Sequence, residues 1–371
     1  MARPALLWLP DSSRFAAFSR PRAWLALGLL ALLLALCLTA LASPDPQAMG
    51  SPAQGHTDQT DLALYEKIVA GVRGGENYYV AAADALRAGS YPLRPFFTFR
   101  LPALATVMAA VPAWLPLRYL LFALVGCVAG AWANRLRGAL ARPLPAVAAA
   151  VLLLGSLLTF LQYELAPFHE IWAALLIALS LALRRPGRWI EAVALGLAAM
   201  LIRETAVLYV VVMAGFAWFE GERREAWGWA AALLLFAAAL AAHAFAVAGV
   251  TGPTDPMSPG WSGLLGFGFF VKSITLATAL QMFPLWAAAL LVGLALFGWA
   301  SWRDPLGLRM VALLAAYAAA IGTFARVDTF YWGLMAAPVF LLGLLFAPAG
   351  IRDLVVRALD KRRITVTRVV R

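Results

Sequence analysis

Apolar runs long enough to cross a membrane recur along this chain, from about residue 24 to residue 347. A spanning helix needs about 20 apolar residues, because a bilayer offers its backbone no hydrogen-bond partners. Only 13% of the residues are charged, against about 25% in soluble domains. The sequence therefore predicts an all-α, polytopic membrane protein and excludes an ordinary cytosolic enzyme.

We expect one integral-membrane domain over residues 1–371, with about ten transmembrane helices. It divides into a first span (23–42), an outer loop with interfacial helices (43–112), the remaining spans (113–349) and a basic cytoplasmic tail (350–371). The later spans are expected at about 117–133, 145–161, 171–183, 190–202, 206–219, 227–248, 284–300, 310–324 and 333–346, with a half-buried outer segment at 264–282. An eleventh span at 101–111 would turn the Arg-rich connector after residue 133 outward, against the positive-inside rule.

Basic residues fix the expected orientation. Arg14, Arg20 and Arg22 precede the first apolar run, which places both termini in the cytoplasm and the loop 43–112 outside the cell's inner membrane. That run is longer than a signal-peptide core, so we interpret it as an uncleaved span, although residues 40–42 resemble a cleavage site.

The net charge of +11 comes from short connectors and the two ends of the chain. This placement favours contact with anionic membrane lipids over nucleic-acid binding. Cys37 and Cys127 lie in apolar runs without metal-site spacing or a disulfide framework, and we expect both to be small core residues. We predict no metal site and no cofactor.

The stretch 57–100 is the longest without a membrane-type segment. Apolar residues at Leu62, Tyr65, Val69 and Val72 have helical spacing, which predicts an interfacial helix over 61–72. Residues 74–75 are both glycine and should end it, and a second helix is expected over 78–88.

Polar side chains from six separate segments are expected on the outer side. An ionised group inside a bilayer costs about 2.5–3.5 kcal/mol at a helix centre, so each is a candidate for function. They are Asp58, Asp61, Arg100, Glu164, His169, Glu170, Arg203, Glu204, Lys272, Arg326 and Asp328. Their common side predicts one wet cavity at the outer interface.

Asp61 and Tyr65 are four residues apart and share one helical face. A partly buried carboxylate there can serve as a general base. The alternative, which composition alone favours, is that Asp58 caps the helix and Asp61 stabilises its first turn.

The pair Asp61-x-x-x-Tyr65, the Gly-rich turn, Tyr78-Tyr79 and a Pro-flanked apolar helix together resemble GT-C membrane glycosyltransferases. These include protein O-mannosyltransferases and lipid A aminoarabinose transferases, whose first outer loop begins Asp-Glu-x-x-Tyr. Leu62 stands at the Glu position of that motif. The order of elements is also similar over most of the chain, including 167–170 and the pair 203–204.

The resemblance implies an enzyme that transfers a sugar, with inversion, from a polyprenyl-phosphate donor to a lipid, glycan or protein acceptor. Asp61 would be the catalytic base. One carboxylate suffices because phosphate leaves without strong acid help, unlike the leaving group in glycoside hydrolysis. Cations stabilise a leaving phosphate. The candidates are Arg203, Lys272, Arg326 and Arg100 for the donor phosphate, and Asp58, Tyr65, His169, Glu170, Glu204 and Asp328 for the acceptor and cavity.

Structural alternatives accompany these roles. In these alternatives Arg203 pairs with Glu204 or another acid, Arg326 pairs with Asp328, and Lys272 extends to the lipid head groups. For the whole protein the alternatives are a transporter or lipid flippase and a non-catalytic partner in envelope glycan assembly. Crowding of polar groups on one side favours the enzyme, since transporters carry such groups near mid-membrane.

Overall fold

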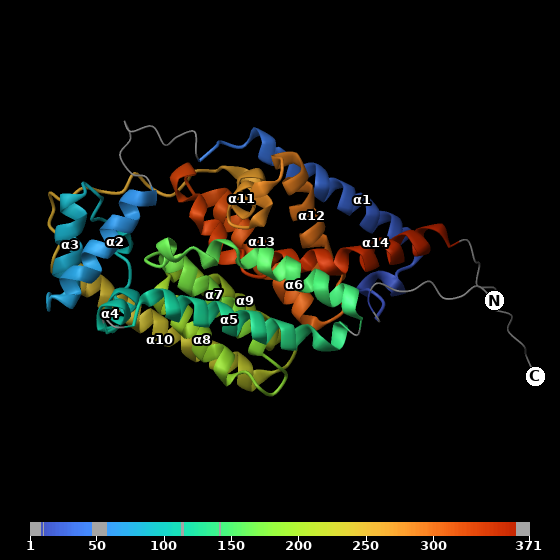
Figure 1. The fold of residues 1–371 in the computed structure, drawn as a ribbon, viewed down its shortest axis with the longest axis horizontal. Coiled ribbons are helices and arrows are strands. Elements are labelled where there is room, and N and C mark those ends of the chain that lie inside the picture. Colours follow the sequence, from blue (N-terminus) through green and yellow to red (C-terminus); the bar gives the residue numbers. More distant parts are fainter. Residues whose placement is uncertain (1–8, 10, 47–57, 113–114, 141, 361–371) are drawn as a thin grey trace, which may run out of the picture.

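The computed structural model describes residues 9, 11–46, 58–112, 115–140 and 142–360. Within these ranges the chain is all-α, as predicted, with isolated bridges only between Arg94 and Met257 and between Arg185 and Arg188. The helices form an elongated bundle, and α2, α3 and α4 make up one end of it (Figure 1).

The bounds of the helices follow the apolar segments of the sequence. They are α1 (Arg20–Cys37), α2 (Asp58–Arg73), α3 (Tyr78–Ala88), α4 (Ala103–Ala110), α5 (Leu117–Leu136), α6 (Pro143–Leu157), α7 (His169–Leu183), α8 (Ile190–Ile202), α9 (Val207–Phe219), α10 (Arg223–Ala248), α11 (Gly266–Leu276), α12 (Leu285–Ser301), α13 (Pro305–Phe324) and α14 (Gly343–Leu359). Short 3-10 segments that matter below are η4 (Phe96–Thr98), η7 (Tyr163–Leu165), η8 (Glu204–Ala206), η10 (Val327–Ala336) and η11 (Phe340–Leu342).

Within the described ranges, four helical segments are long and apolar enough to cross a membrane: Arg20–Ala42, Leu117–Ala139, Arg223–Ala248 and Pro305–Phe324. A fifth arises if the pair Val327–Ala336 and Phe340–Leu359, bent by 58°, counts as one span. These helices give the chain the make-up of a multi-pass membrane protein. With its 8 residues, α4 is about 12 Å long, too short to cross a bilayer alone.

Helices α2 and α3 end close to where the sequence predicts, although α2 begins at Asp58, before the expected start at residue 61. Asn77 caps α3 by accepting a hydrogen bond from the Tyr79 amide at 2.9 Å, and Gly89 follows its last residue. Gly75 breaks the chain after α2 at a φ of +96°, a conformation that glycine adopts without strain.

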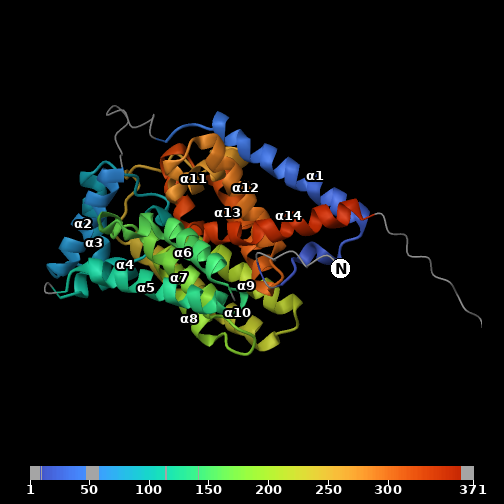
Figure 2. The ribbon, with the colours of Figure 1, turned by 45° about the vertical axis from the view of Figure 1, so that its right-hand side comes forward.

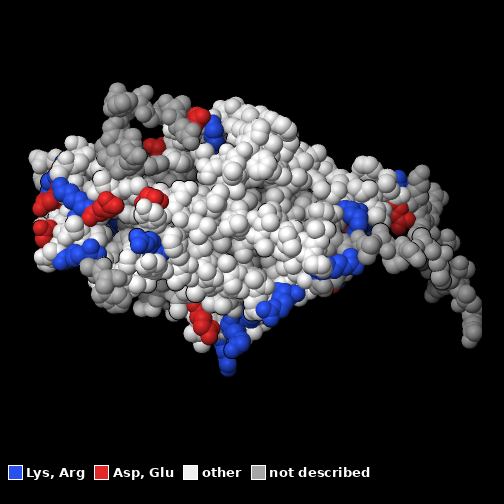
Figure 3. Space-filling model, in the orientation of Figure 1, with Lys and Arg blue, Asp and Glu red and all other residues white. Residues whose placement is uncertain are grey.

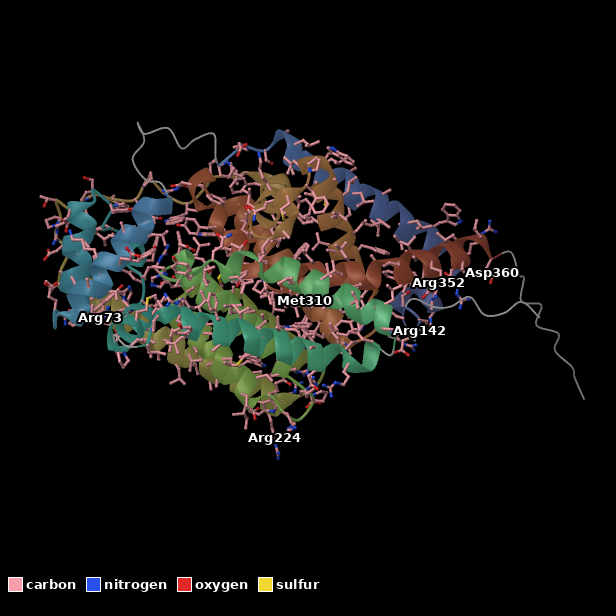
Figure 4. The ribbon with its side chains drawn as sticks, in the orientation of Figure 1. Arg73, Arg142, Arg224, Met310, Arg352 and Asp360 are labelled. Carbon is pink, nitrogen blue, oxygen red and sulfur yellow. The ribbon has the colours of Figure 1, made fainter. Side chains whose placement is uncertain are left out.

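Charged side chains gather at the periphery of the face in Figure 3: at one end, along the lower edge, where Figure 4 labels Arg224, and toward the opposite end. The end formed by α2–α4, which we call the cap end, carries acids and bases, while the middle of the face in Figure 3 is uncharged. Arg73 lies at the cap end and Arg142 and Arg352 at the far end (Figure 4), and the cap keeps its position in the turned view of Figure 2. An uncharged belt between charged ends is what a membrane requires.

The connectors predicted to share the cytoplasmic side do meet at the far end, which we call the basic end. Arg135 after α5 pairs with Asp304 before α13 at 2.9 Å. Arg184 after α7 binds Glu225 of α10 through two hydrogen bonds of 3.0 and 2.7 Å. One buried acid thus holds together the ends of two helices.

Two expectations need correction. Residues 350–359, assigned to the tail, continue α14, because they pack beside α1 and Arg20 donates a hydrogen bond of 3.1 Å to the Ala358 carbonyl. Cys37 is buried as expected, but Cys127 is exposed on α5, whose outward face has no protein neighbour there. Residues 361–371 lie outside the described ranges.

Candidate functional site

A buried polar cluster lies where the cap meets the bundle. We call it the seam cluster, and its members are Tyr65, Arg100, His169, Glu170, Arg203, Glu204 and Tyr331. Tyr65 of α2 accepts a hydrogen bond of 3.2 Å from Arg100 Nε, and its ring lies 4.9 Å from that of His169. Arg203 lies 2.6 Å from Glu170 and 2.9 Å from Glu204. Six of the polar residues selected from the sequence therefore converge here with Tyr331.

Local backbone structure presents these side chains. Pro167 precedes α7, so His169 and Glu170 occupy its first turn. Arg203 ends α8 in an extended conformation, with φ −140° and ψ 116°, before η8 begins. This break in an apolar segment places a charged pair at its end, where the helix backbone no longer constrains it.

The centre of the cluster carries two acids on one arginine. Glu170 is fully buried and Arg203 is 3% exposed. Their ion pair is short but not aligned as a hydrogen bond, so both Glu170 oxygens and Arg203 Nε lack a hydrogen-bond partner in the described residues. Arg203 Nη2, Glu204 Oε1 and both ring nitrogens of His169 lack one as well. Buried polar atoms normally find partners, so this concentration indicates a place for water or a polar ligand.

Arg100 differs from the other candidate cations. Burial lowers its pKa, but the fields of Tyr65, Glu170, Tyr331 and Glu204 raise it well above the ordinary value, so the guanidinium stays charged. Its side chain binds the Tyr65 hydroxyl, and among the described residues no carboxylate lies within ion-pair distance of it. Of the four candidates, Arg100 is thus the one whose charge has no direct acidic or carbonyl partner there.

Asp61 lies at the edge of this cluster. Its Oδ1 accepts a hydrogen bond of 2.7 Å from the Tyr91 hydroxyl. Burial of Tyr91, together with this hydrogen bond, raises the pKa of the Tyr91 hydroxyl. Burial also raises the pKa of Tyr65, the charge of Arg100 lowers it, and those of Asp61 and Glu170 raise it. Asp61, Tyr65 and Arg100 therefore share one electrostatic environment.

The other expected cations are engaged elsewhere. Lys272 of α11 donates hydrogen bonds of 2.9 and 3.1 Å to the carbonyls of Ser43 and Pro44, rather than reaching into the seam cluster. Arg326 binds the exposed Asp328 through two hydrogen bonds of 3.1 and 2.8 Å, as the structural alternative expected. Asp58 is the first residue of α2, and its side chain lies outside the description.

Two tryptophan side chains next to the cluster, Trp261 and Trp332, were not selected from the sequence as site residues. The Trp261 and Trp332 rings stack at 5.6 Å, with Arg326 over the first at 5.1 Å and Arg203 beside the second at 5.8 Å. His243 of α10 was also missed; its Nδ1 lies 3.3 Å from the Tyr79 hydroxyl. A histidine inside a span-length apolar run was a usable signal for the latter.

Two hollows border the opposite face of α2, with volumes of about 360 and 480 Å³. Glu66, Pro116, Leu117 and Pro167 line both. Neither is lined by Asp61, Arg203 or Lys272, so the cavity that we expected Asp61 to share with those cations is not one of these two. Among the described residues no group of His, Cys, Asp and Glu has the arrangement of a metal site.

Fold and cluster together define an all-α protein of the multi-pass membrane type, with a polar cluster where the helices of the cap end meet the bundle. Comparison with family models, with curated proteins and with solved structures found no match. The function of this protein must therefore be inferred from the geometry of the chain itself.

Proposed function

We propose that this protein is a membrane glycosyltransferase of the GT-C type. It would transfer a sugar from a polyprenyl-phosphate donor to an acceptor at the outer face of the cytoplasmic membrane, in cell-envelope synthesis. The observation that carries the proposal is the hydrogen bond between Arg100 and Tyr65, four residues after Asp61. It joins a charged arginine to the tyrosine of the D-x-x-x-Y pair.

The proposed step is a single displacement. Asp61 accepts the proton of the acceptor's hydroxyl or amine, and the acceptor atom forms a bond to the anomeric carbon. The bond from that carbon to the phosphate oxygen breaks with inversion, and its electron pair leaves on the phosphate. Arg100 stabilises the resulting negative charge, and a guanidinium suits this role because it can bind two phosphate oxygens.

The other members of the cluster receive positioning roles. Arg203 is held by Glu170 and Glu204, which leaves it little capacity to neutralise a phosphate. Tyr91 holds the Asp61 carboxylate by a hydrogen bond. The unpartnered nitrogens of His169 and the free oxygen of Glu204 suit the hydroxyl groups of a sugar or acceptor.

The proposal includes the full topology: about ten spans, with both termini in the cytoplasm and the cap outside. The shorter apolar helices, among them α6, α7, α8, α9 and α12, would supply the spans beyond the long ones. The meeting of the Arg-rich connectors at the basic end supports this orientation.

The test uses purified protein in lipid nanodiscs with a labelled polyprenyl-phosphate sugar and a membrane extract as acceptor source. We expect Asp61→Asn to lower the transfer rate by about 10²–10⁴ and Arg100→Met by about 10²–10³. The control is Asp84→Asn, which removes an acid that is 71% exposed on the neighbouring cap helix. Normal transfer by a folded Asp61→Asn variant would remove Asp61 as the base.

One observation favours transport as the second candidate. His243 is 2% exposed within α10, a segment of span length, and the bent pair of η10 and α14 forms a broken segment. Ionisable residues and broken helices are typical of substrate paths. Donor-lipid flipping in proteoliposomes that persists in Asp61→Asn and stops in His243→Phe would favour this alternative.

A further inference from the structure

The two hollows beside α2 adjoin each other, because the same four residues line both, and we treat them as one groove. We call it the lateral groove. One wall is the outward face of α2, from Leu62 to Arg73, and the other is the segment before and at the start of α5. Each volume is within the range of about 300–1,000 Å³ typical of ligand pockets.

The lateral groove lies at the level where lipid head groups would be. Leu117, which lines both hollows, is the first residue of the span-length segment Leu117–Ala139. The deeper lining is apolar and includes Val69, Met108 and Val111. A ligand there would have a polar part at the boundary and an apolar part against the protein.

Three charged side chains of the groove have no charged partner among the described residues, although the Arg118 guanidinium lies over the Tyr119 ring at 5.1 Å. Glu66, Glu164 and Arg118 line the larger hollow, and none of them makes an ion pair within the described part of the chain. Arg73, by contrast, donates a hydrogen bond of 2.8 Å to the Met108 carbonyl. The groove therefore offers two carboxylates and one guanidinium to a ligand.

We propose that the lateral groove binds a phospholipid whose head group carries a primary ammonium beside its phosphate, of the phosphatidylethanolamine type. Glu66 and Glu164 receive the ammonium, and Arg118 binds the phosphate. An anionic lipid without an amine would face two unmatched carboxylates. A quaternary ammonium needs an aromatic cage, and the lining of the larger hollow contains one aromatic residue, the exposed Tyr163.

This site stands apart from the proposed sugar transfer but lies next to it. Pro167 lines the groove, while Phe168 and His169 pack on Tyr65 with ring distances of 6.1 and 4.9 Å. A bound lipid would thus contact the segment that carries two ring contacts of the seam cluster. Lipid binding can nevertheless be measured without any activity.

The experiment is native mass spectrometry of protein purified in detergent and supplied with equimolar phosphatidylethanolamine, phosphatidylcholine and phosphatidylglycerol. We expect at least tenfold preferential retention of phosphatidylethanolamine, lost in the double variant Glu66→Gln and Glu164→Gln. Ala63→Trp, which fills the groove without changing its charge, should reduce retention of all three lipids. Glu191→Gln, an exposed acid in the first turn of α8, is the control and should retain the preference.

The substituted residues are at the surface or the groove lining, and an unchanged unfolding temperature will verify that each variant is folded. Equal retention of the three lipids by the unmodified protein would overturn the proposal. So would an undiminished preference in the double variant, or unaltered binding in Ala63→Trp.

Discussion

The carboxylate of Glu170 lies 2.6 Å from the guanidinium of Arg203, and the two side chains are 0% and 4% exposed. This contact joins the first turn of α7 to the end of α8. Glu204 binds the same guanidinium from the start of η8. One buried arginine therefore links the start of α7 to the junction of α8 and η8.

Removing one member of the Glu170–Arg203 pair should destabilise the folded protein. Glu170→Gln leaves Arg203 with a single acidic partner in a buried setting, and loss of one partner of a buried pair costs about 3–5 kcal/mol. We expect a clearly lower unfolding temperature in detergent. The control is Asp328→Asn, which breaks an exposed pair with a value of roughly 0–1 kcal/mol. Similar effects of the two substitutions would contradict the burial argument.

Lys272 should act on stability and not on donor binding. Lys272→Met removes two hydrogen bonds that tie α11 to the carbonyls of Ser43 and Pro44, and hydrogen bonds to charged groups contribute about 1.5–3 kcal/mol. We expect a lower unfolding temperature with an unchanged KM for the sugar donor in the folded fraction. A raised KM at unchanged stability would return Lys272 to the donor site.

The contact of α12 with α14 should tolerate no added methyl group. A Cβ on Gly298 would lie 1.8 Å from the Gly343 carbonyl oxygen, so the two backbones would have to separate. Gly298→Ala should destabilise the protein by at least about 1–3 kcal/mol, measured by thermal unfolding. Gly126→Ala in α5, where a Cβ meets nothing within 4 Å, should be neutral or stabilising by up to about 1 kcal/mol.

The ion pair between Arg87 of α3 and Asp255, which we call the clamp, should break only in strong acid. The hydrogen bond from Arg87 lowers the pKa of Asp255 from 3.8 to about 2, and the Gly252 amide adds to the effect. Because the folded pKa is the lower one, the clamp stabilises fully above about pH 4 and is lost as the pH falls through 2. Pepsin should therefore cut the 250–258 loop faster in Asp255→Asn than in the unmodified protein at pH 4, and the difference should disappear as the pH falls through 2. Equal rates at pH 4 would contradict this assignment.

The helices themselves were largely predictable from the sequence. The segments expected at 190–202 and 78–88 are the observed α8 and α3, because an apolar run or a helical spacing with clear end signals determines a helix locally. The expected span at 333–346 crosses the break between η10 and α14, although Pro338 within the break is a local signal against a continuous helix. The extension of α14 beyond residue 350 was not predictable, because it follows from packing beside α1.

The candidate site was predictable only as a set of residues. Tyr65, His169, Glu170, Arg203 and Glu204 were selected, and the structure brings them together with Arg100. The sequence did not predict which of the candidate cations remains available to bind a donor phosphate. Lys272 carries the same charge as Arg100, but it binds the carbonyls of Ser43 and Pro44, in a remote segment that the sequence does not place beside it. Arg326 pairs with Asp328 two residues away, which the sequence offered only as an alternative to donor binding.

The sequence alone determined that this chain is helical, membrane-like and charged only at its connectors and ends, because hydrocarbon excludes unpaired charge and unsatisfied backbone at every point along a span. Tertiary structure alone decided that Arg203 lies between two acids, that Arg100 faces Tyr65, and that a groove lined by three charges without an ion pair among the described residues lies behind α2. Such pairings depend on distances between atoms of remote segments, and those distances arise only when the helices pack.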